Sequence, residues 1–215
     1  MKILENLNII PKNEKLYIQA FTHTSYSNEH SEYESYERLE FLGDAVLELI
    51  ISDYLYNEKH LEEGTMTKMR SSYVCEAACC TYAKELGLDE YIRLGSGEAE
   101  ANTTILADVF ESFIGAMYLD QGLETARSIV MNIIRKYIEK KIDFLHDYKS
   151  ELQEQVQTVR KSAVYEIISE TGPAHDRTFT CQVKVDDIIM GTGTGSSKKS
   201  AEQEAAKEAL QKQVK

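Results

Sequence analysis

The strongest fold signal in this 215-residue chain is Glu37-Arg-Leu-Glu-Phe-Leu-Gly-Asp-Ala-Val-Leu47. At about 100° of rotation per residue, a helix places the carboxylates of Glu37, Glu40 and Asp44 on one face and the apolar side chains on the opposite face. The stretch therefore predicts an amphipathic helix with an acidic stripe. Such a stripe is usually the solvated side of a helix, so its chemistry depends on what packs beside it.

A second pair of carboxylates lies in the apolar stretch Ile105-Leu-Ala-Asp-Val-Phe-Glu-Ser-Phe-Ile-Gly-Ala-Met-Tyr-Leu119, where Asp108 and Glu111 are the only charged residues. A helix that is apolar nearly all round is expected to be buried. Two carboxylates one turn apart on such a helix repel each other and lose their hydration, so they need a counter-charge. A divalent cation such as Mg²⁺ or Mn²⁺ suits carboxylate oxygens. A structural ion pair with Arg38 or Arg70 is the alternative.

Packing the two helices face to face predicts one oxygen-rich cluster, because Gly43 and Gly115 permit a close approach. A cluster of this kind can hold one or two hard cations, which activate a water molecule and stabilise the leaving oxygen of a phosphodiester. Mg²⁺ keeps several waters and takes further ligands from substrate phosphate. The predicted metal ligands are Glu40, Asp44, Asp108 and Glu111, with Glu63 as an outer acidic contributor.

Periodicity divides the chain into two domains. Residues 1–144 repeat apolar side chains at three- and four-residue spacing and are predicted to be helical throughout, with one helix running from Met66 to Ala77. Residues 147–215 change to a helix over 151–157, three β-prone stretches and a last helix. We therefore expect a mostly α protein, an all-helical domain followed by a small α-β-β-β-α domain.

The net charge of −12 comes almost entirely from the first domain. Residues 1–146 carry a charge of −11, whereas residues 147–215 carry −1. Nucleic-acid-binding proteins usually show a basic footprint, so net charge alone argues against such a partner. The argument weakens once four of the carboxylates are interpreted as cation ligands, because the second domain is close to neutral.

Neither export nor a membrane partner is expected. No apolar run reaches the roughly 18 residues that cross a bilayer, and Glu5 interrupts any apolar core of a signal peptide. The four cysteines form no CxxC pair. Cys75 and Cys79 lie one helical turn apart, which leaves a soft-metal or redox site open, but reduced thiols in a cytoplasmic protein are the expected state.

The second domain carries candidate contacts to a nucleic acid. Gly191-Thr-Gly-Thr-Gly195 is predicted to break the third strand and to form a loop before the last helix, which Ser196 or Ser197 caps. Exposed N–H groups, the helix dipole, Lys198 and Lys199 would together bind phosphate. The alternative is an ordinary helix cap with two solvated lysines. A-form RNA presents 2′-hydroxyls in a shallow groove, which suits neutral polar groups, and further contacts are offered by Gln153, Gln157 and His175.

Several segments together carry a family resemblance. Residues 37–47 closely match the signature of bacterial ribonuclease III, and residues 106–120 resemble the second acidic motif of that family. Ala20-Phe-Thr-His-Thr-Ser25 resembles its N-terminal motif. The double-stranded RNA-binding domain of the family has its counterpart in residues 147–154, 172–175 and 193–206, which resemble its motifs. The resemblance implies a ribonuclease III nuclease domain over 1–144 and a double-stranded RNA-binding domain over 147–215.

The resemblance implies a Mg²⁺-dependent endoribonuclease that hydrolyses phosphodiester bonds of double-stranded RNA, with Mn²⁺ able to substitute. Its products would carry 5′-phosphates, 3′-hydroxyls and a short 3′ overhang, and its substrates would be precursors of ribosomal RNA and some messenger and transfer RNAs. Asp44 and Glu111 would be the catalytic carboxylates, Glu37 and Glu63 would act in the cleavage valley, and Phe41 would insert into the partner of an obligate homodimer. The implied RNA contacts are Gln153, Glu154, Gln157, His175, Ser197, Lys198 and Lys199.

One segment departs from the family pattern. Gly95-Ser-Gly-Glu-Ala-Glu-Ala-Asn102 is shorter than the Gly-Gly-Arg-type loop of the family and has Glu98 and Glu100 in place of a basic residue. The contacts of that loop therefore do not carry over. Two rival functions stay open, a double-stranded RNA-binding regulator with a vestigial nuclease fold and an unrelated metal phosphohydrolase. The first usually lacks one or more carboxylates, and the second gives no account of the C-terminal domain.

Overall fold

The computed structural model describes residues 1–98, 100–145, 147–173 and 177–213, with backbone only at Lys59 and Gln213. The chain forms two compact units, Met1–Leu145 and His146–Lys215, and each has its own hydrophobic core. The first unit is helical and the second is an α-β-β-β-α unit, which confirms the predicted fold class. Within the described residues, no helix combines the length and apolar character needed to span a bilayer.

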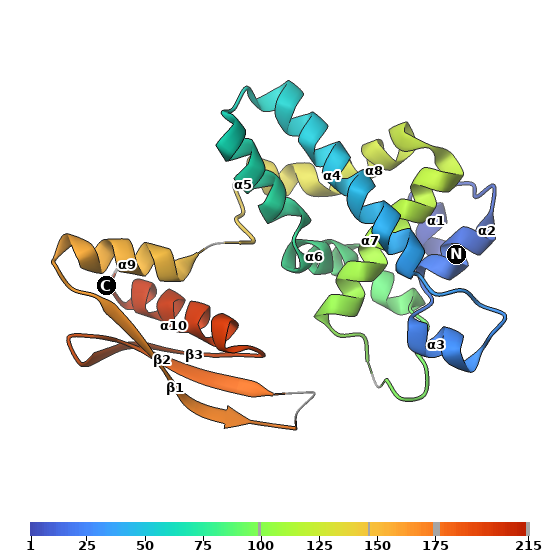
Figure 1. Cartoon of the computed structure of the whole chain (residues 1–215). Coiled ribbons are helices and arrows are strands. Elements are labelled where there is room, and N and C mark those ends of the chain that lie inside the picture. Colours follow the sequence, from blue (N-terminus) through green and yellow to red (C-terminus); the bar gives the residue numbers. More distant parts are fainter. Residues whose placement is uncertain (99, 146, 174–176, 214–215) are drawn as a thin grey trace. The chain divides into compact units, whose positions relative to one another are not determined.

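The first unit is built around one apolar helix. Its elements are α1 (Lys2–Asn6), α2 (Glu14–Ala20), α3 (Thr24–Glu29), α4 (Glu37–Lys59), α5 (Glu63–Val74), α6 (Glu76–Leu86), the 3₁₀-helix η1 (Leu88–Tyr91), α7 (Thr103–Gln121) and α8 (Leu123–Glu139). Helix α7 packs against α2, α4, α6 and α8 (Figure 1). Most of its side chains are buried, as the apolar stretch predicted.

Helices α4 and α7 touch through their backbones at two glycines. A Cβ atom on Gly43 would lie 1.8 Å from the carbonyl oxygen of Glu111, and one on Gly115 would lie 2.3 Å from the carbonyl oxygen of Leu39. Real Cβ atoms do not approach so closely, so only glycine fits at either position. The predicted close approach is therefore confirmed, and it sets the spacing between the acidic residues of the two helices.

The helix predicted from Met66 to Ala77 is wrong at its C-terminal end. Helix α5 ends at Val74 and α6 begins at Glu76, because Cys75 is extended with φ −72° and ψ 161°. The break lets Tyr73 pack on the ring of Phe144 while Cys79 is buried on the other side of the bend. A continuous helix would not bury both side chains in the same way, so tertiary packing overrides helix propensity here.

Asp120, near the C-terminus of α7, holds the N-terminal segment in place. Its carboxylate accepts hydrogen bonds from the backbone N–H of Lys12 (3.0 Å) and Asn13 (2.7 Å), from the Tyr17 hydroxyl (3.0 Å) and from the Gln121 amide (2.6 Å). Burial alone would raise the pKa of Asp120, but these hydrogen bonds together hold it below its usual value. Asp120 is a structural carboxylate.

We expect Asp120→Ala to destabilise the first unit by on the order of 3 kcal/mol, because it leaves the buried hydroxyl of Tyr17 and three part-buried donors without their acceptor. The pKa of Asp120 is lowered in the folded state, so this stability is present above about pH 4 and shrinks as the pH falls below it. Urea unfolding of the parent and the variant at two pH values measures the difference. Glu90→Ala, at an exposed position, is the control, and an equal loss there would contradict the assignment.

The second unit packs two helices on one face of a three-stranded antiparallel sheet (Figure 1). Its elements are α9 (Tyr148–Thr158), β1 (Ala163–Thr171), β2 (Thr178–Val185), β3 (Ile188–Gly195) and α10 (Lys198–Gln213). Alternate residues Cys181, Val183 and Val185 of β2 are buried, as the period-two pattern predicted. The buried stripe of α10 consists of Ala201, Ala205, Ala206, Ala209 and Leu210.

The glycine run that was predicted to break the third strand is part of it. Strand β3 continues through Gly191, Gly193 and Gly195. A Cβ on Gly191 would lie 2.3 Å from the carbonyl oxygen of Ala205, and one on Gly193 would lie 2.2 Å from the Ala205 nitrogen. The glycines therefore let α10 lie directly on the strand, so they serve packing rather than a phosphate-binding loop.

Candidate functional site

The acidic stripe of α4 lies within electrostatic reach of α7, because the charge of Asp108 acts on Glu40. Glu37 and Asp44 are exposed, whereas Glu40 is half-buried between them. Burial is the main cause that raises the pKa of Glu40 to about 7, and the negative charges of Asp108, Glu37 and Asp44 raise it further. The stripe is therefore more than a solvated helix side, because a carboxylate of α7 contributes to its electrostatics.

The two carboxylates of α7 are both half-buried. Burial, followed by the charges of Asp44, Glu40 and Asp108, raises the pKa of Glu111 to about 8. Burial also raises the pKa of Asp108. The structure thus brings the four predicted residues, two from each helix, close enough to oppose one another's ionisation.

Two neutral donors that the sequence analysis missed contact the α7 carboxylates. The Tyr36 hydroxyl donates to Oδ2 of Asp108 at 3.1 Å, and the Cys79 thiol donates to Oε1 of Glu111 at 3.7 Å. Tyr36 directly precedes the acidic signature, and the spacing of Cys79 indicates only a pairing with Cys75. Periodicity gave no signal for either contact, because the donors and their acceptors are 72 and 32 residues apart in the chain.

Ion pairing does not balance these charges. Among the residues that the structure describes, none of the four carboxylates forms an ion pair with Lys or Arg. Arg70 instead contacts the Ser52 hydroxyl at 3.4 Å, and Arg38 is exposed. The structural ion pair that the sequence left open is therefore not supported. The remaining counter-charges are the imidazole of His23, whose charge lowers the pKa of Asp108 against the effect of burial, and a cation from solution.

The four side chains do not form a closed metal cage. Over the described part of the chain, no group of three or more His, Cys, Asp or Glu side chains is arranged to hold a metal ion. A closed cage is not what Mg²⁺ requires, since it usually takes one or two carboxylates and completes its shell with water and phosphate.

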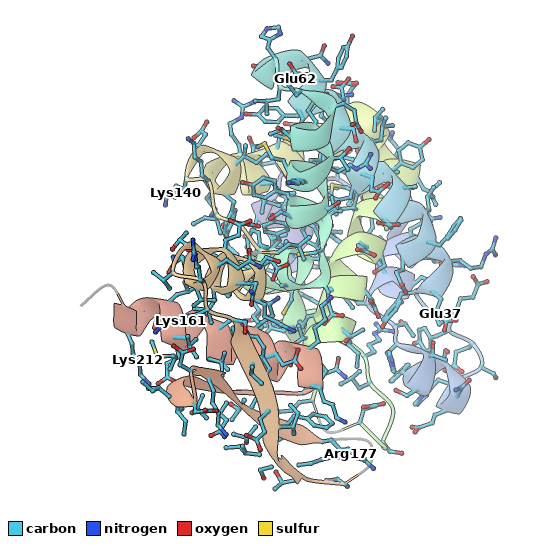
Figure 2. All side chains as sticks on the ribbon, turned by 60° about the vertical axis from the view of Figure 1, so that its left-hand side comes forward. Glu37, Glu62, Lys140, Lys161, Arg177 and Lys212 are labelled. Carbon is cyan, nitrogen blue, oxygen red and sulfur yellow. The ribbon has the colours of Figure 1, made fainter. Side chains whose placement is uncertain are left out.

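Glu63 lies apart from this cluster within one chain. It is in the first turn of α5, where its carboxylate accepts a hydrogen bond from the Thr67 hydroxyl at 3.0 Å. It lines a pocket that also contains Asp53, nine residues or about 14 Å of helix rise beyond Asp44. Figure 2 shows Glu37 and Glu62, the residue before Glu63, well apart on the first unit.

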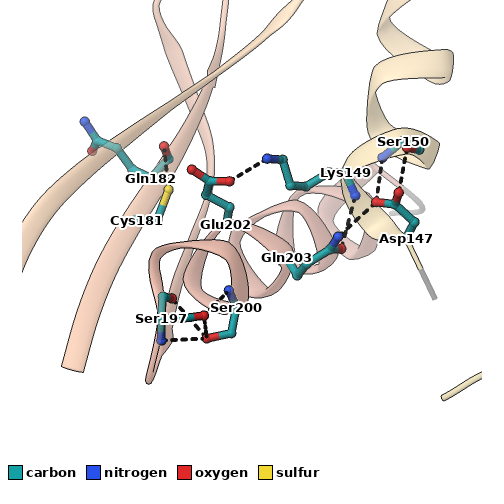
Figure 3. Close-up of polar contacts among 9 residues, drawn as sticks. All are labelled: Asp147, Lys149, Ser150, Cys181, Gln182, Ser197, Ser200, Glu202 and Gln203. Atoms are coloured by element: carbon teal, nitrogen blue, oxygen red, sulfur yellow. Dashed lines mark hydrogen bonds and ion pairs between the residues drawn. The ribbon is translucent and has the colours of Figure 1, made fainter. Parts of the chain in front are cut away.

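In the second unit, the candidate RNA contacts lie on the two helices. Lys198 and Lys199 are exposed in the first turn of α10, and Ser197 caps that helix by accepting a hydrogen bond from Ser200 N–H at 3.1 Å (Figure 3). On α9, Glu154 and Gln157 are exposed, and Gln153 accepts a hydrogen bond from Ala163 N–H. His175 lies outside the described residues.

A polar network joins the two helices of the second unit (Figure 3). The Gln203 side chain donates to Asp147 at 2.9 Å and accepts from Lys149 N–H at 3.3 Å. Lys149 also forms an ion pair with Glu202 at 2.5 Å. Hydrogen bonds from Gln203 and Ser150 lower the pKa of Asp147 to about 2. The two helix surfaces that carry the candidate contacts are therefore fixed relative to each other.

Residues 13–138 match the family model described as ribonuclease-III-like, and residues 148–213 match the double-stranded RNA binding motif. The chain belongs to the ribonuclease III family. It is 46% identical to ribonuclease 3 of Aster yellows witches'-broom phytoplasma over an alignment of 217 residues. The alignment covers 99% of this chain and 91% of that protein. Ribonuclease 3 of Bacillus cereus is 48% identical, over 97% of this chain and 89% of that protein.

Solved structures give the same family for the helical unit. The nuclease domain of ribonuclease III from Campylobacter jejuni is 34% identical with a TM-score of 0.58, and the match covers 63% of this chain and 95% of that domain. A second structure of that domain is 32% identical with a TM-score of 0.56. The resemblance inferred from the sequence motifs is thereby confirmed.

Proposed function

We propose that this chain is an endoribonuclease that cuts double-stranded RNA by metal-assisted hydrolysis. The observation that carries the proposal is the group of four carboxylates, Glu40 and Asp44 on α4 and Asp108 and Glu111 on α7, at the closest approach of the two helices. Three of them, Glu40, Asp108 and Glu111, have raised pKa values, and no described Lys or Arg forms an ion pair with any of the four. The family supports the reaction class.

The donor set fits Mg²⁺, with Mn²⁺ as a substitute, because all four side chains offer hard carboxylate oxygens. When bound there, the ion would polarise the phosphate and lower the pKa of a water molecule. We propose all four carboxylates, Glu40, Asp44, Asp108 and Glu111, as metal ligands. Asp44 and Glu111 would be the most directly catalytic of them. Glu37, exposed beside Glu40, would extend the acidic surface toward the scissile strand.

The second unit would bind the duplex. Exposed lysines at the start of α10 suit phosphates, whereas the neutral and acidic groups on α9 suit the 2′-hydroxyls of a shallow RNA groove. The match to the double-stranded RNA binding motif supports this division of labour. We propose Gln153, Glu154, Gln157, Ser197, Lys198 and Lys199 as the contacting residues, and His175 on the resemblance alone.

A second copy of the chain would complete the enzyme. An exposed stripe runs along α4 through Phe41, Ala45, Leu49 and Tyr56, and Phe41 is 82% exposed. So large an exposed apolar surface on a well-packed helix favours a protein partner. We propose that it is the homodimer interface and that Glu63, remote from Asp44 in one chain, reaches a cleavage valley in the dimer. Sedimentation as a stable monomer would contradict this.

We also propose the cytoplasm as the location of the chain. All four cysteines are free, and thiols are kept reduced in that compartment. Recovery of the protein from the culture medium rather than the cytosolic fraction of its source cells would contradict the proposal.

The function is tested with labelled duplex RNA in Mg²⁺ and in EDTA. We expect cutting only in Mg²⁺, no cutting of the single strand or of duplex DNA, and products with 5′-phosphates, 3′-hydroxyls and a short 3′ overhang. Binding of the duplex without cutting in Mg²⁺ would contradict the proposal and favour a double-stranded RNA-binding regulator with a vestigial nuclease fold. Hydrolysis of small phosphodiesters but not of duplex RNA would favour the unrelated phosphohydrolase.

We expect the double variant Lys198→Ala, Lys199→Ala to weaken duplex binding about five- to thirtyfold, since exposed ion pairs contribute up to about 1 kcal/mol each. The slope of log affinity against log salt should fall by about one per lysine. Binding of the full chain is measured in EDTA, which prevents cutting. The control is the double variant Lys207→Ala, Lys212→Ala, which removes the same charge further along α10. An equal loss of duplex affinity in this control would show that Lys198 and Lys199 make no specific contact.

A further inference from the structure

Tyr36 is a buried aromatic residue directly before the acidic signature. Its side chain is 3% exposed, and its hydroxyl donates to Oδ2 of Asp108 at 3.1 Å. Tyr36 is the N-terminal flanking residue of α4, yet its side chain makes no hydrogen bond to the helix end. The hydroxyl is therefore directed across to α7 instead of serving the helix that it begins.

The backbone of Tyr36 and one side of its ring are held by neighbouring residues. Its backbone N–H donates to the carbonyl of Thr22 at 2.9 Å, and its own carbonyl accepts from the N–H of Glu40 at 2.9 Å. The imidazole of His23 lies beside the ring at 5.7 Å between centroids. A hydroxyl fixed in this way constrains the Asp108 carboxylate that it contacts, because its own rotamer is locked by packing.

We propose that Tyr36 is a positioning residue that orients the Asp108 carboxylate for metal binding. A hydrogen bond to Oδ2 leaves Oδ1 available as a ligand and limits rotation of the carboxylate. Hydrogen bonds to metal ligands of this kind commonly change metal affinity or activity by about 10- to 100-fold. The inference rests on the proposed function, in which Asp108 is a metal ligand.

The chain contains a matched pair that separates positioning from simple stability. Tyr17 is fully buried and donates its hydroxyl to Oδ2 of Asp120 at 3.0 Å. Both acceptors lie on α7, but Asp120 is twelve residues, or about 18 Å of helix rise, from Asp108. Tyr17→Phe and Tyr36→Phe thus remove the same group from the same kind of bond, and only the second bond reaches the carboxylate cluster.

The experiment compares the parent, Tyr36→Phe and Tyr17→Phe as full-length chains. Two quantities are measured, the Mg²⁺ concentration for half-maximal cutting of duplex RNA and the affinity for Mn²⁺ in the absence of RNA by electron paramagnetic resonance. We expect Tyr36→Phe to raise the Mg²⁺ midpoint and to weaken Mn²⁺ binding by about tenfold, with most of the cutting rate restored at saturating Mg²⁺. Tyr17→Phe should lower the unfolding midpoint and leave both metal constants unchanged.

Failure of the positioning role of Tyr36 and failure of the proposed function give different results. Metal constants of Tyr36→Phe within about twofold of the parent, or an equal change in Tyr17→Phe, would overturn the positioning role while the parent still cuts duplex RNA. If the parent binds Mn²⁺ but cuts nothing, the proposed function fails and the Mn²⁺ measurements alone decide whether Tyr36 orients Asp108.

Discussion

Glu111→Gln should abolish cleavage of duplex RNA while leaving binding of the duplex intact. The amide keeps the shape of the side chain and an oxygen that accepts from the Cys79 thiol, but it removes the negative charge that a cation requires. Loss of one preorganised electrostatic group at an active site typically costs about 10²- to 10³-fold in rate, and a lost metal ligand should cost at least as much. Single-turnover cutting in Mg²⁺ measures the rate, and binding in EDTA measures the duplex affinity.

The same variant should be more stable than the parent when no divalent cation is present. The pKa of Glu111 is raised to about 8 by burial and by the neighbouring carboxylates. Its ordinary value is about 4.3, so the parent loses stability as the pH rises from about 4.5 to 8. Near pH 8, Glu111→Gln should therefore gain on the order of 1 kcal/mol or more in EDTA. A rate loss accompanied by a stability gain cannot come from misfolding.

Two outcomes would contradict this assignment. Cutting by Glu111→Gln at the parent rate would remove Glu111 from the site. A flat stability profile for the parent in EDTA between pH 5 and 8 would show that the carboxylates do not oppose one another. Glu139→Gln, at the exposed end of α8, is the matched control and should leave both the rate and the pH profile unchanged.

Local sequence patterns predicted the features that depend on one helix alone, namely which residues share a face and which are buried. Helical spacing put Glu40 and Asp44 on one face of α4, and the lack of other charges around Asp108 and Glu111 indicated burial. Both inferences needed only the 3.6-residue period and the energetic penalty of desolvation. The family motifs then gave the reaction class, and the comparisons confirmed the family.

The parts that were missed depend on contacts between distant segments. Tyr36 and Cys79 reach their carboxylates only because α4 and α6 pack on α7, and no spacing rule connects residues so far apart. The glycines of β3 were expected to form a loop, because a glycine run is a turn signal unless a helix lies against the strand. Cys75 breaks a regular helical pattern for the same reason, since the packing on either side of the bend decides the backbone.

Gly43→Ala should damage both the fold and the site. Its added methyl group would lie 1.8 Å from the carbonyl oxygen and 2.5 Å from the carbonyl carbon of Glu111. These atoms belong to the backbone of a buried helix, so they cannot move without separating α4 from α7. Overpacking of a core lowers the free energy of unfolding by about 1–3 kcal/mol and occasionally more. We expect Gly43→Ala to lower it by about 3 kcal/mol or more. Urea unfolding of the parent and the variant measures it.

The matched control is Gly64→Ala in α5, where a Cβ would have no neighbour within 4 Å. Alanine is favoured over glycine in a helix by up to about 1 kcal/mol, so Gly64→Ala should be neutral or stabilising. Changes of opposite sign in the free energy of unfolding of the two Gly→Ala variants would assign the effect of Gly43→Ala to the contact between the helices. Equal stability of the two variants would contradict the close packing of α4 on α7.

The effect on catalysis follows from the position of Gly43. It lies between Glu40 and Asp44, and the backbone that it touches is that of Glu111. Any separation of the helices therefore moves two carboxylates away from the other two, and metal affinity should fall even at temperatures where the variant stays folded. Metal titrations of cutting on the folded variant test this step. A parent-like Mg²⁺ midpoint in a destabilised Gly43→Ala would mean that helix spacing supports the fold without setting the geometry of the site.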